Sequence, residues 1–229
     1  MEKNLMKFYL IRQAIDQKVI GKVEATQSTL MTEGYDYGAE NSVWKIARKD
    51  FTHQDFLKTN FEKIKLEPKA IFTDLISSMA INPLFVTIVH RDLLDFLYQF
   101  KLAETFSKEV KVVHPVMNIE KEYVAFYQEN KYDLIDFGKS EFCVKHINEN
   151  WSEARPKRFE DEFQLKTFIE EEPWTTSYQA TSLKLKEDMD LFRLHKFGGY
   201  IVSERLKEAI EDEKFTGISF EPAENLALA

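Results

Sequence analysis

Residues 198–222 carry the pattern that most constrains the fold, a strand followed by a capped helix and a second strand. The β-rich start of this block ends at Ser203, whose hydroxyl can accept hydrogen bonds from the free amides of a first helical turn. Glu204 follows at a position where the helix dipole favours negative charge. Residues 215–222 then form a second β-rich run, in which Gly217 permits a bend or a close backbone approach. We therefore expect a strand, a helix and a strand here.

The same order is found upstream. Residues 84–89 form an apolar, β-branched run that is typical of a strand buried on both faces. In residues 92–100 the apolar side chains recur at i, i+3, i+4 and i+7, as on one face of a helix that packs on a core. Residues 109–113 are again β-rich. This region predicts a second strand-helix-strand unit.

The two units align with an offset of 113 residues, and the matches fall on core positions. The alignment places Ile88 over Ile201, Leu93 over Leu206, Leu97 over Ile210 and Lys101 over Lys214. Two interpretations stay open. One is an internal duplication, and the other is a pair of generic helix-crossover units packed on one sheet.

The N-terminal region predicts mainly strands. Two β-rich runs, 6–11 and 18–25, flank a polar turn and predict an opening antiparallel pair. Residues 42–47 predict a further strand. Residues 56–65 have a mixed periodicity that fits a short helix and a loop equally well.

Two segments separate the predicted units. Residues 132–142 predict two short strands around a turn at Gly138 and Lys139. Residues 148–182 are densely charged and have the weakest periodicity in the chain, so they predict an irregular surface region.

The order of the elements predicts an α+β fold, with N-terminal antiparallel strands followed by two strand-helix-strand units around a mixed β-sheet. We expect one domain over residues 1–229. Within it, two lobes at 1–147 and 183–229 can be distinguished, joined by the irregular charged segment 148–182.

Composition excludes several classes of protein. Cys143 is the only cysteine, so neither an internal disulfide nor a thiolate metal cluster can form, as is usual in a reducing cytosol. No window reaches the roughly 18 to 20 apolar residues of a membrane span, and no signal sequence is evident. We expect a soluble cytoplasmic protein without membrane contact.

The net charge of −8 disfavours nonspecific binding to nucleic acid and attracts a basic partner, although it also serves solubility.

The sequence supports no catalytic, cofactor or metal site. Its five histidines are scattered singly, without a metal-binding spacing, and the phosphate-loop, dinucleotide-binding and nucleophile-elbow motifs are absent. Cys143 and His146 are three residues apart, a spacing that directs their side chains to opposite faces of a strand. We expect no catalytic residues, no cofactor and no metal.

One cluster suggests a binding surface. Acidic and aromatic residues gather near the end of the charged segment, and a tryptophan beside exposed carboxylates can anchor a basic protein surface. The candidate partner-binding residues are Glu170, Glu171, Glu172, Trp174 and Tyr178. The alternative is a solvated charge run, with Trp174 folded back into the core.

Four segments of the chain, in order, resemble the bacterial immunity-protein family numbered eleven. They are residues 72–75, 84–100, 132–142 and 190–222. The third is the most specific, because its Asp-Phe-x-Lys-Ser-x-Phe string is followed later by Leu-Phe-Arg-Leu and Ile-Val-Ser-Glu-Arg-Leu. The chain departs from the family at His90, where the first unit usually has a serine cap.

The resemblance implies a protein encoded beside a polymorphic toxin, which binds the cognate toxin domain and neutralises it without catalysis. It carries over no active-site residues. The alternative from the residues themselves is a small enzyme, a hydrolase or nucleotide-modifying protein, with a site built from scattered carboxylates and histidines. A scaffold protein without a toxin partner is a third hypothesis.

Overall fold

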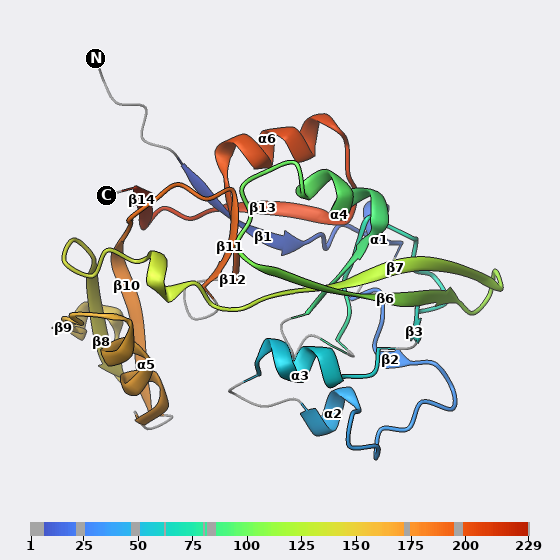
Figure 1. Ribbon diagram of the computed structural model, residues 1–229, viewed down its shortest axis with the longest axis horizontal. Coiled ribbons are helices and arrows are strands. Elements are labelled where there is room, and N and C mark those ends of the chain that lie inside the picture. Colours follow the sequence, from blue (N-terminus) through green and yellow to red (C-terminus); the bar gives the residue numbers. More distant parts are fainter. Residues whose placement is uncertain are drawn as a thin grey trace.

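The chain has an α+β fold, and the residues described by the computed structural model build three β-sheets (Figure 1). The structure describes residues 7–21, 26–46, 51–61, 63–79, 81, 86–171, 175–194 and 199–228. The central sheet has the order β11-β12-β1-β13. Its strands are β1 (Phe8–Gln13), β11 (Leu191–Leu194), β12 (Gly199–Ser203) and β13 (Ile218–Pro222).

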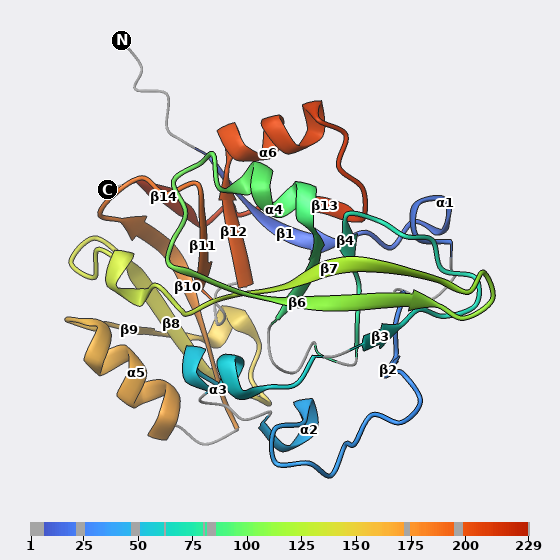
Figure 2. The same cartoon turned by 45° about the vertical axis from the view of Figure 1, so that its right-hand side comes forward.

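The second sheet is six-stranded and mixed, with the order β2-β3-β6-β7-β5-β4. Its strands are β2 (Leu30–Met31), β3 (Lys63–Lys65), β4 (Leu75–Ile76), β5 (Thr87–His90), β6 (Thr105–His114) and β7 (Ile119–Gln128). The β6–β7 hairpin is paired along its whole length, from Thr105 with Gln128 to His114 with Ile119. Its closed end projects at one side of the molecule (Figure 1 and Figure 2).

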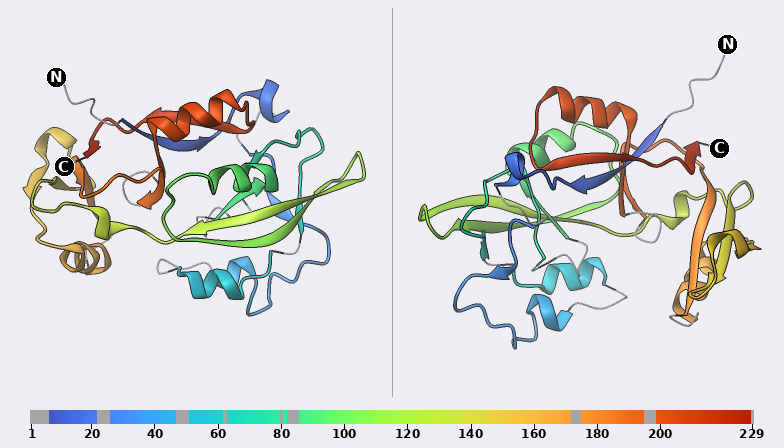
Figure 3. Two further views of the ribbon diagram at one scale, coloured as in Figure 1. Left: turned by 45° about the horizontal axis from the view of Figure 1, so that its top comes forward. Right: turned by 180° about the vertical axis from the view of Figure 1, so that it is seen from behind.

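The third sheet has the order β14-β10-β8-β9 and lies at the opposite end of the molecule (Figure 3). Its strands are β8 (Glu141–His146), β9 (Arg155–Lys157), β10 (Thr176–Leu185) and β14 (Leu226–Leu228).

The helices of the fold are short. They are α1 (Gln17–Ile20), α2 (Val43–Ile46), α3 (His53–Lys58), α4 (Arg91–Leu97), α5 (Glu162–Glu171) and α6 (Glu204–Asp212), with 3₁₀ turns η2 (Tyr132–Leu134) and η3 (Trp151–Glu153).

Both predicted strand-helix-strand units are confirmed, and they share one topology. In β5–α4–β6 the two strands run parallel with β7 antiparallel between them, and in β12–α6–β13 the strand between is β1. The units lie in two different sheets, which corrects the expectation that they pack on one sheet. Their helices α4 and α6 nevertheless share a core (Figure 2). A duplication stays a prediction.

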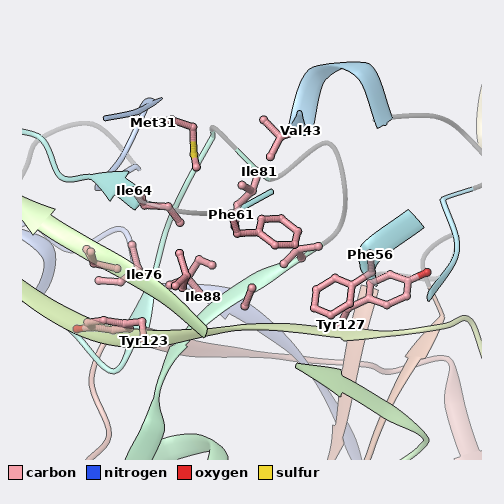
Figure 4. Packing of buried hydrophobic residues seen from close by; sticks show 14 of the residues in the cluster. Met31, Val43, Phe56, Phe61, Ile64, Ile76, Ile81, Ile88, Tyr123 and Tyr127 are labelled. Atoms are coloured by element: carbon pink, nitrogen blue, oxygen red, sulfur yellow. The ribbon is translucent and has the colours of Figure 1, made fainter. Parts of the chain in front are cut away.

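Three clusters of buried apolar side chains hold the sheets together. The first core lies on one face of the six-stranded sheet, where the rings of Phe56 and Tyr127 stack at 5.5 Å between centroids (Figure 4). The second core lies between the central sheet and the third sheet with α5. The third core lies under α4 and α6. Because side chains alternate along a strand, Phe8 enters the second core and Tyr9 packs on the third.

The helix caps follow the sequence pattern. Ser203 begins α6, and its Oγ accepts a hydrogen bond from the Leu206 amide at 3.2 Å, as predicted. His90 takes the corresponding place at α4, where its Nδ1 accepts from the Asp92 amide at 3.4 Å. The buried carboxylate of Asp190 supports the first cap, since it accepts hydrogen bonds from the Ser203 hydroxyl, the Arg205 guanidinium and the Lys101 amide.

The predicted opening antiparallel pair is wrong. Residues 17–20 form α1, which begins at the cap Asp16, while 22–25 lie outside the described residues. The partners of β1 are β12 and β13, far along the chain. Local strand propensity cannot predict this pairing, because the paired strands are far apart in the sequence.

Residues 42–47 were also predicted as a strand, yet residues 43–46 form α2. The hydroxyl of Ser42 accepts from the Lys45 amide at 3.3 Å, and a serine at such a position caps a first turn. Residues 56–65 contain the end of α3, the loop residues 59–61 and strand β3. The helix and loop alternatives therefore each hold for part of the segment, and the strand was not predicted. The capping box of Thr52 and Asp55 starts α3.

The two intermediate segments differ from expectation as well. Within 132–142, residues 132–134 form the 3₁₀ turn η2, Ile135 forms an isolated bridge with Leu185, and the strand β8 begins only at Glu141. Segment 148–182 contains β9, α5 and most of β10, so it is not irregular. Its periodicity is weak because α5 buries only Leu165 and Phe168. The division into two lobes stays a prediction.

The predicted close approach at Gly217 is confirmed. Its φ is +81°, and a Cβ on this residue would lie 2.1 Å from the carbonyl oxygen of Leu75. Gly217 thus lets the start of β13 pass directly against β4.

We expect Gly217→Ala to lower the free energy of unfolding by about 1–3 kcal/mol, through backbone strain and the contact with Leu75. Urea denaturation followed by circular dichroism measures the loss. Gly34→Ala is the matched control, because Gly34 has a φ of +87° with open space around its Cβ position. Equal losses of unfolding free energy in the two variants would show that the contact with Leu75 does not destabilise Gly217→Ala.

Candidate functional site

The described histidines serve local structure. His114 is buried, with its Nε2 3.1 Å from the carbonyl oxygen of Ala70 and its Nδ1 accepting from the amides of Val116 and Met117. This pattern requires the neutral ring, with Nε2 protonated. His114 thereby fixes the projecting end of the β6–β7 hairpin.

The other described histidines are more exposed. His53 Nδ1 lies 2.7 Å from the carboxylate of Glu129, and its ring stacks on Phe106. His146 Nδ1 accepts from the Asn148 amide, and His195 lies outside the described residues. Within the described ranges, no three His, Cys, Asp or Glu side chains are grouped to hold a metal ion. Cys143 is buried in β8, whereas His146 at the end of the same strand is exposed.

The structure separates the predicted partner-binding residues. Glu170 and Glu171 are exposed at the C-terminal end of α5. Tyr178 lies in β10 and packs on the second core, with its ring 5.7 Å from that of Phe168 on α5. Burial raises the pKa of the Tyr178 hydroxyl above its ordinary value. Glu172 and Trp174 lie outside the described residues. The binding role of this cluster stays a prediction.

A groove lies between β9 and α5, and the predicted residue Glu171 lines it. Its volume is about 520 Å³. Its lining residues are Lys157, Arg158, Phe159, Phe163, Gln164, Thr167, Phe168 and Glu171. The side chain of Phe163 is 75% exposed, the highest exposure among the large apolar residues that the structure describes.

Local sequence explains why α5 presents this face. Asp161 begins the helix by accepting a hydrogen bond from the Gln164 amide at 2.8 Å. Leu165 and Phe168 are buried in the second core. Positions 163, 164, 167 and 171 therefore turn toward the groove, because residues three to four apart share a helix face.

The groove has a cationic wall and an acidic end. Lys157 Nζ lies 5.0 Å from the ring centroid of Phe168 and 5.8 Å from that of Phe159. Among the ion pairs of the described residues, none involves Lys157 or Arg158, whereas the nearby Arg155 pairs with Glu149 at 3.6 Å. Glu170 and Glu171 carry the negative charge at the far end of α5.

The partner-binding residues predicted from the sequence include Glu171 of this groove, but not Phe163, Lys157 or Arg158. A usable signal was present, because Phe163 stands in a strongly charged stretch whose helix buries only two side chains. Aromatic residues are enriched at protein interfaces, so a phenylalanine on the solvent side of such a helix is an interaction candidate. The helix itself was not predicted, and so its two faces could not be assigned.

A second groove of similar size lies between the central sheet and the third sheet. Its volume is about 510 Å³. Its floor is apolar, formed by Leu10, Leu183 and Ile201 among others, and Glu221 and Glu224 stand at its polar side. The carboxylate of Glu221 is already paired with Arg12 at 2.8 Å.

Residues 152–225 match the model of a family described as Immunity protein family (Imm11). This finding confirms the family resemblance inferred from the sequence, and it supports an immunity role. The match contains every residue that lines the β9–α5 groove, together with β10, β11, β12, α6 and β13. The resembling segments before residue 152 lie outside the match. No curated protein matches the chain.

None of the helices in the described ranges is both long and apolar enough to span a membrane. The longest helix there, α5, has ten residues and carries four glutamates or lysines.

Proposed function

We propose that this chain is the immunity protein of a bacterial polymorphic toxin system, which binds its cognate toxin domain in the cytoplasm and neutralises it without catalysis. The observation that carries the proposal is the family match over residues 152–225. The fold adds support, because the matched segment builds a surface of mixed charge around one exposed aromatic ring.

The proposed partner is a basic toxin domain. The net charge of −8 creates a field that attracts a basic protein and speeds the encounter. The proposed contact residues are Glu170 and Glu171 at the end of α5, together with Glu172 and Trp174, which lie outside the described residues. Tyr178 supports it from beneath by packing on Phe168.

The test is co-expression with the toxin domain encoded by the adjacent upstream gene. Survival of the host and co-elution of the two chains in size-exclusion chromatography are the expected results. Survival without co-elution would contradict neutralisation by binding, and death of the host despite soluble expression of both chains would contradict the immunity role.

We expect the association rate of the two proteins to fall by roughly tenfold or more between about 0.05 M and 0.5 M salt, because screening shortens the range of the attraction. The double charge reversal Glu170→Lys with Glu171→Lys should lower the rate further at low salt. Stopped-flow fluorescence measures both effects.

Glu208→Lys with Asp212→Lys is the matched control for this measurement. These two exposed residues lie on α6, away from α5 (Figure 1), and the change in net charge is the same. If both double reversals slow association equally, the attraction comes from net charge alone and α5 has no special part. An association rate that does not change with salt would contradict electrostatic attraction altogether.

A further inference from the structure

We propose that the β9–α5 groove is the surface on which the toxin docks, and that its occupant is a toxin segment with an apolar side chain between a carboxylate and a basic residue. This inference rests on the proposed function and adds the site and the chemistry of the partner. The occupant's apolar side chain packs on Phe163, its carboxylate meets Lys157 and Arg158, and its basic residue meets Glu171.

The exposed ring of Phe163 supplies the apolar contact. Aromatic side chains bury a large area with little loss of freedom, and phenylalanine is among the residues enriched at the cores of protein interfaces. Phe163 is also rigidly presented, since the buried Leu165 and Phe168 hold α5 on the second core. A partner that covers this ring removes apolar surface from water without first ordering a loop.

The wall formed by β9 requires negative charge in the partner. Lys157 and Arg158 are both exposed, and neither takes part in an ion pair among the described residues, although the chain has an excess of acidic groups. The ammonium group of Lys157 stands over the aromatic floor of Phe159 and Phe168, so it lies within the groove. The planar guanidinium group of Arg158 can donate two parallel hydrogen bonds to a carboxylate.

The acidic end of the groove requires positive charge in the partner. Glu171 lines the groove from α5, and Glu170 stands beside it, while no ion pair of the described residues uses either carboxylate. The groove therefore carries charge of both signs, positive on its β9 side and negative at the C-terminal end of α5. Such an arrangement fixes the direction in which a segment binds, and it repels a segment that enters with the charges reversed.

The second groove lacks these properties and provides a control. It has nearly the same volume, but no lysine or arginine is among its described lining residues, and its carboxylate Glu221 is paired with Arg12. Large apolar side chains such as Leu183 and Ile201 lie buried in its floor rather than projecting from it.

The experiment uses the full chain and the toxin domain of the adjacent gene, with binding measured by surface plasmon resonance. We expect Phe163→Ala to weaken affinity by at least tenfold, mainly through faster dissociation, with an unchanged melting temperature. The pair Lys157→Glu with Arg158→Glu should weaken it to a similar extent, and so should Glu171→Lys. Glu224→Lys in the second groove should bind as the unaltered chain does.

Hydrogen exchange gives a second measurement that needs no variant. Amides of α5 and β9 should become protected in the complex, whereas those of α4 and α6 should not change. Unaltered affinity of the groove variants, or protection confined to α4 and α6, would overturn the docking site while the immunity function stands. Failure of the unaltered chain to bind the toxin domain would instead overturn the proposed function, and the groove assignment with it.

Discussion

Phe192→Ala is expected to lower the free energy of unfolding by about 3–5 kcal/mol, because it deletes a fully buried ring from a packed core. Phe192 lies in β11 with 0% of its surface exposed, and its ring meets that of Phe8 edge to face at 5.9 Å. This contact joins two strands of the central sheet on the side that faces the third sheet. Urea denaturation followed by far-ultraviolet circular dichroism measures the loss.

Phe163→Ala is the matched control, since it removes the same atoms from a side chain that is 75% exposed. Its free energy of unfolding should stay within about 0.5 kcal/mol of the unaltered value. The two variants therefore separate the roles of the two rings, one in stability and the other in binding. A loss for Phe192→Ala no larger than that for Phe163→Ala would contradict the packing of the second core described above.

Asp190→Asn is expected to lower the free energy of unfolding by about 2–4 kcal/mol at neutral pH, because buried hydrogen bonds to a charged acceptor are lost. The carboxylate is 1% exposed and accepts from the Ser203 hydroxyl at 2.6 Å and from the Lys101 amide at 3.0 Å. Arg205, whose side chain is 62% exposed, completes the ion pair. The residue thus joins α6, β11 and the loop after α4.

The effect of Asp190→Asn should depend on pH. Burial raises the pKa of the Asp190 carboxyl, but hydrogen bonds from Arg205, Ser203 and the Lys101 amide together lower it more, so the pKa lies below its ordinary value of 3.8. The carboxylate therefore contributes its full stabilisation above the unfolded-state pKa, and this contribution is lost as the pH falls through the folded-state pKa.

Denaturation of both chains at several pH values checks this dependence. The difference in unfolding free energy between the unaltered chain and Asp190→Asn should be largest at about pH 7 and should shrink at about pH 3. Comparing the two chains at each pH removes the contribution of the other carboxylates. A difference that stays constant over this range would show that the charge of Asp190 does not stabilise the fold.

Elements governed by neighbouring residues were predictable from the sequence. The order of strand, helix and strand at both units followed from apolar periodicity, and the start of α6 followed from Ser203. The close approach at Gly217 followed from the freedom of a residue without Cβ. The family resemblance was likewise found in the sequence and confirmed over residues 152–225.

The sequence by itself determined the α+β class, the two strand-helix-strand units and the relation to an immunity family, because periodicity, caps and short motifs act over a few residues. Only the tertiary structure decided that β1 lies between β12 and β13, and that α5 closes a groove with β9. These features depend on contacts between residues that are far apart in the sequence. Burial of Leu165 and Phe168 in a core shared with the central sheet left Phe163 on the solvent side. The sequence did not predict α5, so the two faces of this helix could be assigned only from the tertiary structure.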